Sequence, residues 1–243
     1  MPTNLRPVPD LRPARRHGFL VAVDGPSGSG KSTLARAVAR CTGLAYLDTG
    51  AMYRALTWWC LDQGLALTDR DAVARAAMSL DLAVGTDPAA PWVRVAGRDL
   101  SAAVRETRIS AAVSEVATNL EVRDTMRRRQ RAIIADCAAR TGGCVVEGRD
   151  ITTVVAPDAD VRVLLTASQD ARLARRTLEL HGGTDADSLA ATRDQIVRRD
   201  RDDSTVSQFT TASDGVVTVD TSQLDLADSV AAVLAVVREH APA

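Results

Sequence analysis

A glycine-rich segment near the start of the chain has the residue types and spacing needed to hold nucleotide phosphates. It follows a short apolar run, precedes a helical pattern and matches G-x-x-x-x-G-K-[ST] at every required position. Glycines let backbone N–H groups turn inward around phosphate oxygens, and a helix N-terminus adds partial positive charge. We therefore predict an ATP-binding loop made of Gly25, Pro26, Ser27, Gly28, Ser29, Gly30, Lys31, Ser32 and Thr33.

Two side chains of this loop have distinct predicted roles. Lys31 is the only lysine in the chain, and every other strong cation is arginine. A compact ammonium can bridge the β- and γ-phosphates and move with the transferred group, which a planar guanidinium does less well. The Ser32 hydroxyl is the predicted protein ligand of Mg²⁺, which we expect as the cofactor alongside ATP. The alternative, a glycine-rich turn without a ligand, fits this context poorly.

Several arginines recur just beyond the ends of predicted strands or helices, together with carboxylates. Guanidinium groups bind phosphate oxygens through two parallel hydrogen bonds and can neutralise charge that develops during phosphoryl transfer. For any single arginine, a solvated surface charge remains the alternative. Taken as a set, they favour a small acceptor that carries its own phosphate, and the set consists of Arg54, Arg123, Arg149 and Arg199.

Composition excludes several other classes of protein. The 243 residues include 30 Lys+Arg and 31 Asp+Glu, a net charge of −1 that provides no field for a polyanion. The arginine run at 127–131 is the only hint of a nucleic-acid module, and the few aromatic residues disfavour it. Without a second lysine the guanine-reading Asn-Lys-x-Asp motif cannot exist, which excludes a regulatory GTPase. An ATP-driven motor or transporter domain, whose catalytic carboxylate the run ending at Glu147 could imitate, is disfavoured by chain length.

Cysteine spacing and hydropathy bear on the compartment. The four cysteines form no CxxC pair, so neither a zinc site nor a redox pair is indicated. No apolar run reaches membrane-spanning length, and the first residues lack the apolar stretch of a signal peptide. We expect a cytoplasmic, monomeric protein without a membrane or nucleic-acid partner.

Hydrophobic patterning predicts an α/β fold with a doubly wound parallel sheet and helices on both faces. Short apolar runs predict strands at 19–23, 144–146, 161–165 and 216–219. Helical patterns lie between and after them, at roughly 50–63, 120–140, 168–181, 186–200 and 224–237. Alternating segments at 80–84 and 92–95 predict a small antiparallel insertion.

The motifs together resemble those of the bacterial cytidylate kinases, a branch of the nucleoside monophosphate kinases. The first is generic, but DTGAMYR at 48–54 followed by EGRD at 147–150 is specific to that family. The resemblance runs from Phe19 to the terminal helix. Its matching segments are 24–33, 47–54, 122–123, 128–131, 147–150, 153–155, 198–200, 203–205 and 219–222.

The resemblance implies direct in-line transfer from MgATP to CMP or dCMP, giving ADP with CDP or dCDP. Arg54 would hold the acceptor phosphate, and Thr49 would lie at the start of the acceptor site. Asp203 and Arg199 would contact the ribose and phosphate. The cytosine pocket would consist of Ser114, Arg123 and Asp150, with Arg149 beside the phosphates. The implied catalytic residues are Lys31, Arg149 and Arg199.

The resemblance also suggests how the chain is divided. We expect a flexible tail at 1–17 and a P-loop kinase domain at 18–243. Within that domain, about 79–118 would form the monophosphate-binding insertion and about 170–205 a helical lid. A solvated helix face is the alternative for Arg172, Arg175 and Arg176.

Two departures from the family pattern leave alternatives open. The arginine expected after Asp203-Ser204-Thr205, which would help hold the acceptor phosphate, is absent. We expect weakened CMP affinity or turnover or, as the alternative hypothesis, that Arg201 substitutes for it. Thr152 stands where the family usually has glycine and is expected to crowd a loop beside the acceptor. A kinase for shikimate or another nucleotide, or a paralogue with a shifted acceptor, therefore remains an alternative.

Overall fold

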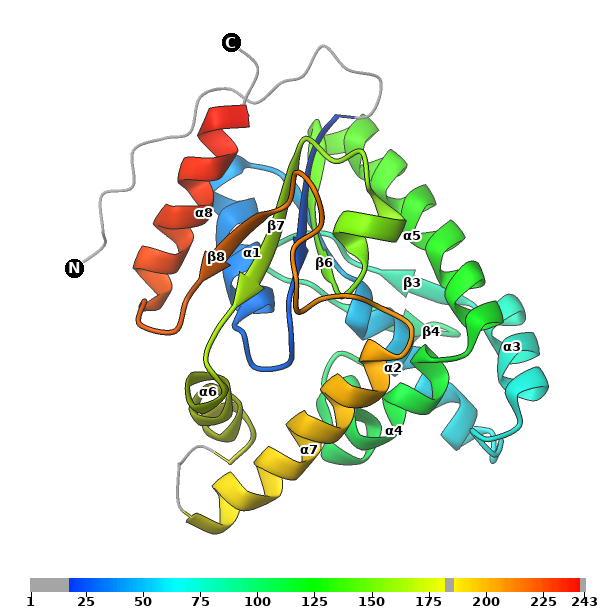
Figure 1. The fold of residues 1–243 in the computed structure, drawn as a ribbon. Coiled ribbons are helices and arrows are strands. Elements are labelled where there is room, and N and C mark those ends of the chain that lie inside the picture. Colours follow the sequence, from blue (N-terminus) through cyan, green and yellow to red (C-terminus); the bar gives the residue numbers. More distant parts are fainter. Residues whose placement is uncertain (1–17, 182–185, 241–243) are drawn as a thin grey trace.

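Five parallel strands form the centre of the structure, a computed structural model that describes residues 18–181 and 186–240 (Figure 1). The predicted tail at 1–17 lies outside the described residues. The strand order is β2-β6-β1-β7-β8, so the first strand lies in the middle of the sheet. The strands are β1 (Phe19–Asp24), β2 (Ala45–Asp48), β6 (Gly143–Gly148), β7 (Val161–Thr166) and β8 (Val217–Asp220).

Helices cover both faces of this sheet, which confirms the predicted doubly wound fold. Every residue of β1 is buried, as expected for a central parallel strand. Val21 and Val23 face a core shared with α1 (Lys31–Thr42) and α8 (Leu226–His240). Leu20 and Ala22 face the opposite core, shared with α2 (Thr49–Asp62) and α5 (Leu120–Thr141).

A second, antiparallel sheet confirms the predicted β insertion. It consists of β3 (Leu82–Val84), β4 (Val93–Val95) and β5 (Arg98–Asp99), in that order. The helix α3 (Arg70–Ser79) precedes it, and the short turn η1 (Ala103–Arg105) and α4 (Thr107–Ala117) follow. Because α4 packs on α2, the insertion is held against the main sheet.

The remaining helices lie near the carboxyl edge of the central sheet, where α6 (Gln169–His181) packs on α7 (Ala186–Ser204) (Figure 1). Within the predicted lid, residues 182–185 lie outside the described part of the chain. None of the described helices has both the length and the apolar character needed to cross a bilayer.

Parallel strands bring the ends of β1, β2 and β6 together at one edge of the sheet. In the register of the sheet, Asp24 lies beside Gly148 and Asp48 lies beside Glu147. Ligands of open α/β sheets bind outside this carboxyl edge. The segments that follow these three strands are therefore placed to build one site.

A buried carboxylate fixes the chain just after the end of β6. Asp24 accepts hydrogen bonds from the backbone N–H groups of Ile151 (2.9 Å) and Thr152 (2.8 Å), at the start of the π-helical turn η2 (Ile151–Val155). The Thr152 hydroxyl donates to the same carboxylate at 2.6 Å. Burial raises the pKa of Asp24 to about 6, although these hydrogen bonds favour its charged form.

The departure from the family pattern at Thr152 does not narrow the cavity. Its side chain is buried beside Asp24 and does not line the cavity described below. A glycine at this position would lack the hydroxyl that binds Asp24. The threonine therefore adds a hydrogen bond that holds the segment after β6, and it does not reduce the volume of the cavity.

Candidate active site

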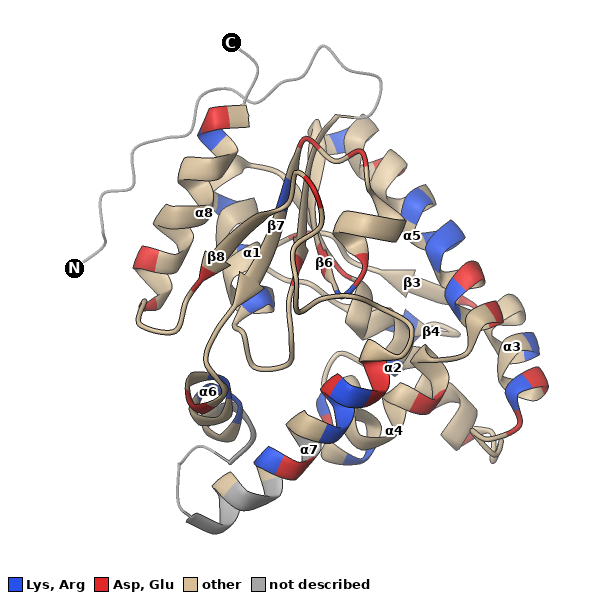
Figure 2. Ribbon diagram, in the orientation of Figure 1, with Lys and Arg blue, Asp and Glu red and all other residues tan. Residues whose placement is uncertain are grey.

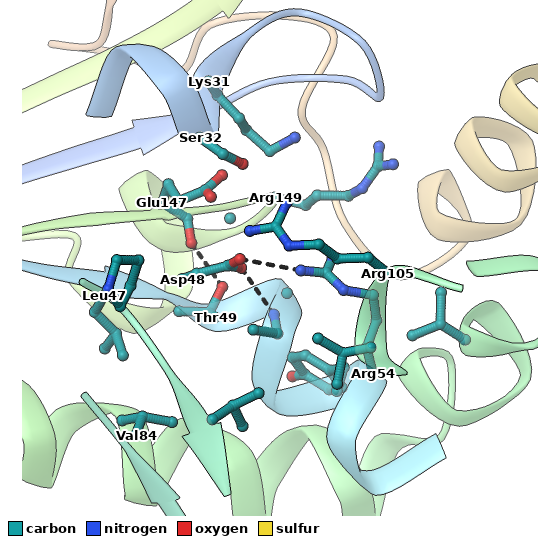
Figure 3. A pocket seen from close by; sticks show the side chains of 18 of the residues that line it. Lys31, Ser32, Leu47, Asp48, Thr49, Arg54, Val84, Arg105, Glu147 and Arg149 are labelled. Carbon is teal, nitrogen blue, oxygen red and sulfur yellow. Dashed lines mark hydrogen bonds and ion pairs between the residues drawn. The ribbon is translucent and has the colours of Figure 1, made fainter. Parts of the chain in front are cut away.

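A cavity of about 510 Å³ opens at the carboxyl edge of the central sheet (Figure 3). Its walls come from the glycine loop, the start of α2, the insertion, α4, the residues after β6, and both α6 and α7. Most of the predicted site residues line it, namely Ser27, Gly28, Gly30, Lys31, Ser32, Thr33, Thr49, Arg54, Arg123, Arg149, Asp150, Arg199 and Asp203.

The glycine loop forms one end of the cavity, between β1 and α1. Gly30 has a φ of 85°, a left-handed conformation that favours glycine, and it caps the first turn of α1. Gly25, Pro26 and Ser29, also predicted to bind ATP, do not line the cavity. They shape the loop from behind, and the carbonyl of Pro26 accepts a hydrogen bond from Lys31 Nζ at 3.3 Å.

Lys31 and Glu147 form the charged floor of this end (Figure 3). Burial lowers the pKa of Lys31 to about 8, with Glu147 opposing the shift and nearby arginines adding to it. Burial, together with Asp48, raises the pKa of Glu147. The Tyr46 hydroxyl donates to Glu147 Oε1 at 2.9 Å and holds the carboxylate in place.

Glu147 also lines the cavity, although we predicted no site role for it. Its signal was present, because an apolar run that ends in a carboxylate is the pattern of an ATP-hydrolysing motor. The structure brings this carboxylate next to Lys31 and Ser32.

Arg149 is held from three sides in the middle of the cavity wall. Its Nη1 lies 2.8 Å from Asp200 Oδ1, and its Nε lies 2.8 Å from Asp203 Oδ2. The ring of Phe209 packs under the guanidinium, 4.4 Å from its central carbon. Among the described residues, the buried Nη2 has no hydrogen-bond acceptor. A rigid guanidinium with one nitrogen left without an acceptor is suited to bind an anion.

Arg54 and Arg199 add two further cations to the same wall. Arg54 Nη2 lies 3.0 Å from Asp48 Oδ2, while Asp48 also caps α2 by accepting from Ala51 N–H at 2.7 Å. Arg199 Nε is buried without a hydrogen bond in the described part of the chain, 3.7 Å from Asp203 Oδ2. Burial, with Arg149 adding to it, lowers the pKa of Arg199. Figure 2 shows acidic and basic residues close together along α7.

The other end of the cavity pairs a carboxylate with an arginine. Asp150 Oδ2 accepts from Arg123 Nη2 at 2.5 Å, and the same nitrogen donates to Ser207 Oγ at 2.9 Å. Burial raises the pKa of Asp150, with Arg123 opposing the shift. Ser114, predicted to lie in the cytosine pocket, does not line the cavity. Its hydroxyl donates to Asp203 Oδ1 at 3.0 Å. It supports Asp203, which lines the wall.

Thr49 and Gly148 meet where α2 begins. The Thr49 hydroxyl donates to the carbonyl of Glu147 at 2.7 Å, so the hydroxyl ties α2 to β6. A Cβ on Gly148 would lie 2.6 Å from Thr49 Oγ1, closer than two such atoms can approach. This contact gives a structural reason for the glycine in the EGRD segment.

The hypothesis that Arg201 substitutes for the missing arginine is wrong in this structure. Its side chain is 75% exposed, bonds Asp202 at 3.0 Å and does not line the cavity. Val206 occupies the position of the expected arginine, between Asp203 and Ser207, both of which line the cavity.

The alternative of a solvated face on α6 is wrong for all three of its arginines. Arg172 is 16% exposed and paired with Asp200. Arg175 donates to the carbonyl of Thr221 at 2.6 Å, and Arg176 lines the cavity.

Further cationic residues reach the cavity from elements where no motif marked them. Arg36 comes from α1, and Arg105, which ends η1, points into the cavity (Figure 3). Nothing in their spacing sets them apart from the many other arginines of the chain. Arg36 lies one turn after Ser32 on α1, whereas Arg105 reaches the site only through the fold of the insertion.

The fold and this cavity together define a phosphotransferase of the P-loop class, with a nucleotide loop facing a second, arginine-lined binding region. A family model for cytidylate kinase matches residues 21–239. A cytidylate kinase of Streptomyces griseus is 45% identical over 91% of this chain and 94% of that protein. One from Cutibacterium acnes is 46% identical over 89% of this chain and 94% of that protein. The chain belongs to the cytidylate kinase family.

Among solved structures, a gluconokinase from Sinorhizobium meliloti aligns with 93% of this chain and 95% of its own. Its identity is 20% and its TM-score is 0.45. We draw no conclusion about the acceptor from so low a similarity. The family assignment rests on the family model and the cytidylate kinase relatives.

Proposed function

We propose that this protein transfers the γ-phosphoryl group of ATP to CMP and dCMP, forming CDP and dCDP. One observation carries the proposal: a single cavity has a nucleotide loop at one end and an Arg123–Asp150 pair at the other. Between them lie Arg149 and Arg199, each with one buried nitrogen that has no hydrogen-bond acceptor among the described residues. Phosphoryl transfer depends on positioning and charge neutralisation, so no protein nucleophile is required. The family relationship supports the same acceptor.

Selection of cytosine would depend on Asp150. A carboxylate can accept a hydrogen bond from the exocyclic amine of cytosine, which uracil replaces with a carbonyl. A uracil carbonyl facing a buried carboxylate would lose that hydrogen bond and add repulsion. Arg123 holds Asp150 at 2.5 Å and favours its charged form against the effect of burial.

The phosphates would lie between the two ends. Lys31 would contact the β- and γ-phosphates, and Arg54 the acceptor phosphate. Arg149 offers its buried Nη2, and Arg199 its buried Nε, to the group in transfer. In a site shielded from water these charges stabilise the transition state more strongly than exposed charges would.

The residues present fit a magnesium ion brought with ATP. The Ser32 hydroxyl and the carboxylates of Glu147 and Asp48 line the same part of the cavity and supply the oxygen donors that Mg²⁺ prefers. The described part of the chain holds no cluster of three or more His, Cys, Asp or Glu that could bind a metal. We therefore assign most of the coordination to the nucleotide. When bound, the ion would neutralise phosphate charge.

A paralogue with a shifted acceptor is the second candidate, because the arginine expected at position 206 is missing. Identities of 45% to cytidylate kinases over most of the chain disfavour it. Monomeric assembly, a cytoplasmic location and a lid role for α6 and α7 remain predictions.

A coupled ADP-release assay tests the proposal. The purified protein receives MgATP and, separately, CMP, dCMP, UMP, AMP, GMP, dTMP or shikimate, with Lys31→Ala as the control. We expect turnover chiefly with CMP and dCMP, lost in Lys31→Ala. Turnover chiefly with another acceptor, or ATP binding without any turnover, would reject the proposal.

A further inference from the structure

Asp200 lies one residue after Arg199 on α7, outside the cavity lining, and contacts three separate parts of the chain. Its Oδ1 accepts from Ser27 N–H of the glycine loop at 3.1 Å and from Arg149 Nη1 at 2.8 Å. Its Oδ2 accepts from Arg172 Nη1 of α6 at 2.5 Å. One carboxylate thus joins the nucleotide loop, the cavity wall and the neighbouring helix.

Arg172 closes this arrangement by a second contact with the loop. The same Nη1 donates to the carbonyl of Ser27 at 3.0 Å, so Ser27 is held through both its N–H and its C=O. A Cβ on Gly28 would lie 2.5 Å from the carbonyl oxygen of Arg172. The backbone of α6 therefore packs directly on the tip of the loop, and only glycine allows that approach.

The charges in this cluster are balanced so that Asp200 stays ionised. Burial alone would raise its pKa, but Arg149, the Ser27 N–H and Arg172 outweigh burial and lower it. An ionised carboxylate is an acceptor only, so it can serve all three donors at once. An amide at this position would keep the shape and lose that property.

We infer that Asp200 is a positioning residue that fixes the glycine loop and Arg149 relative to the helices α6 and α7, and thereby sets the affinity for ATP. The expected effect on kcat and KM rests on the proposed function, whereas the contacts of Asp200 do not. The contacts that carry it involve Ser27, Arg149 and Arg172, each with its nitrogen within 3.1 Å of a carboxylate oxygen of Asp200. Misplacing such groups by about 1 Å can cost about a hundredfold in rate.

Asp202 provides a matched control on the same helix. It pairs with Arg201, which is 75% exposed, and it does not line the cavity. Exposed ion pairs contribute little to stability. The substitutions Asp200→Asn and Asp202→Asn therefore make the same chemical change two residues apart, with different predicted results.

The experiment measures ATP binding by calorimetry without an acceptor, and then kcat and KM for ATP and CMP. We expect Asp200→Asn to weaken ATP binding by about tenfold to a hundredfold, the cost of losing hydrogen bonds to a charged group, and Asp202→Asn to match the wild type. Equal ATP affinities in the two variants would overturn the inference. Because the binding measurement needs no acceptor, it tests Asp200 even if the wild type fails to phosphorylate CMP.

A second variant separates positioning from a general loss of structure. Arg172→Gln removes the partner of Asp200 on α6, and we expect it to weaken ATP binding with a melting temperature near that of the wild type. In the double variant the two losses should not add, and its affinity should stay within about twofold of the weaker single variant. Additive losses, or normal ATP binding in Arg172→Gln, would overturn the inference.

Discussion

Two groups of arginines in this protein pair with carboxylates in different surroundings. On the outer face of α5, Arg127 and Arg128 pair with Asp124, and Arg140 pairs with Asp136 one turn away, with side chains 39–70% exposed. At the cavity three of the four pairs join separate elements, whereas Arg199 pairs with Asp203 within α7, and the arginine side chains are only 12–17% exposed. The cavity group consists of Arg54, Arg123, Arg149 and Arg199.

The difference shows why residue type alone does not identify a phosphate site. Exposed pairs at i,i+4 contribute about 0.3–0.5 kcal/mol and are screened by salt. A buried pair is expensive to break, because the remaining charge has lost both water and its partner. The cavity carboxylates hold the guanidinium groups in place, while Arg149 Nη2 is buried without a hydrogen-bond acceptor among the described residues.

Substituting an arginine of the cavity should lower activity far more than substituting an arginine of the outer face of α5. Arg149→Gln is expected to lower kcat for CMP by about a thousandfold, because it removes a preorganised donor from the charge that develops in transfer. Arg128→Gln on α5 should change kcat by less than about twofold. Steady-state kinetics of both variants check this, and comparable losses in the two would refute the assignment.

Selectivity for the base should depend on the carboxylate at the far end of the cavity. Asp150→Asn is expected to reduce the ratio of kcat/KM for CMP to that for UMP by about a hundredfold, since an amide can also donate to the uracil carbonyl. Competition between the two nucleotides in one reaction measures this ratio. Asp124→Asn on α5 is the control, and an unchanged ratio in Asp150→Asn would remove Asp150 from base recognition.

The cationic end of the cavity should show a pH dependence that the exposed arginines lack. Burial lowers the pKa of Lys31 to about 8, so the free enzyme loses this charge as the pH rises through that value. At saturating CMP, kcat/KM for ATP should fall by about tenfold per pH unit above the pKa. Lys31→Arg, although less active, should show no such fall, and a flat wild-type profile to pH 9.5 would contradict the account.

Restoring the missing arginine should give the smallest effect. Val206 lies between two residues of the cavity wall, so Val206→Arg is expected to lower KM for CMP by about tenfold or less. Val206→Gln, which adds length without charge, should leave KM unchanged. A rise in KM in the arginine variant would mean that this chain has adapted its wall to a shorter side chain.

The sequence predicted the nucleotide half of the site better than the acceptor half. The glycine loop is one continuous segment between a strand and a helix, so its motif predicted both which residues form it and how they are arranged. Four of the five central strands were expected. β2 (AYLD) was missed because it has no β-branched residue, whereas β8 (VTVD), which is equally short, has three. The helices α3 and α4 were missed because the insertion was recognised only by its strands.

The remaining features of the site could not be predicted, because they depend on contacts between segments that are distant in the sequence. Ser114 and Asp203 are 89 residues apart, and nothing in their spacing indicates that the serine supports the carboxylate from behind. Asp200 follows Arg199 directly, yet only the packing of α6 on α7 shows that it binds the glycine loop. Arg201, one residue further along α7, is exposed, and this too follows from how the helix packs.

CMP binding by calorimetry tests most directly whether the cavity arginines form the acceptor site. The wild type, Arg54→Gln and Arg128→Gln are titrated with CMP under the same salt conditions. We predict that Arg54→Gln weakens CMP binding by about tenfold or more, because it removes a charge-assisted contact to the acceptor phosphate, and that Arg128→Gln binds as the wild type does. Equal affinities in the three proteins, or no CMP binding by the wild type, would contradict the account.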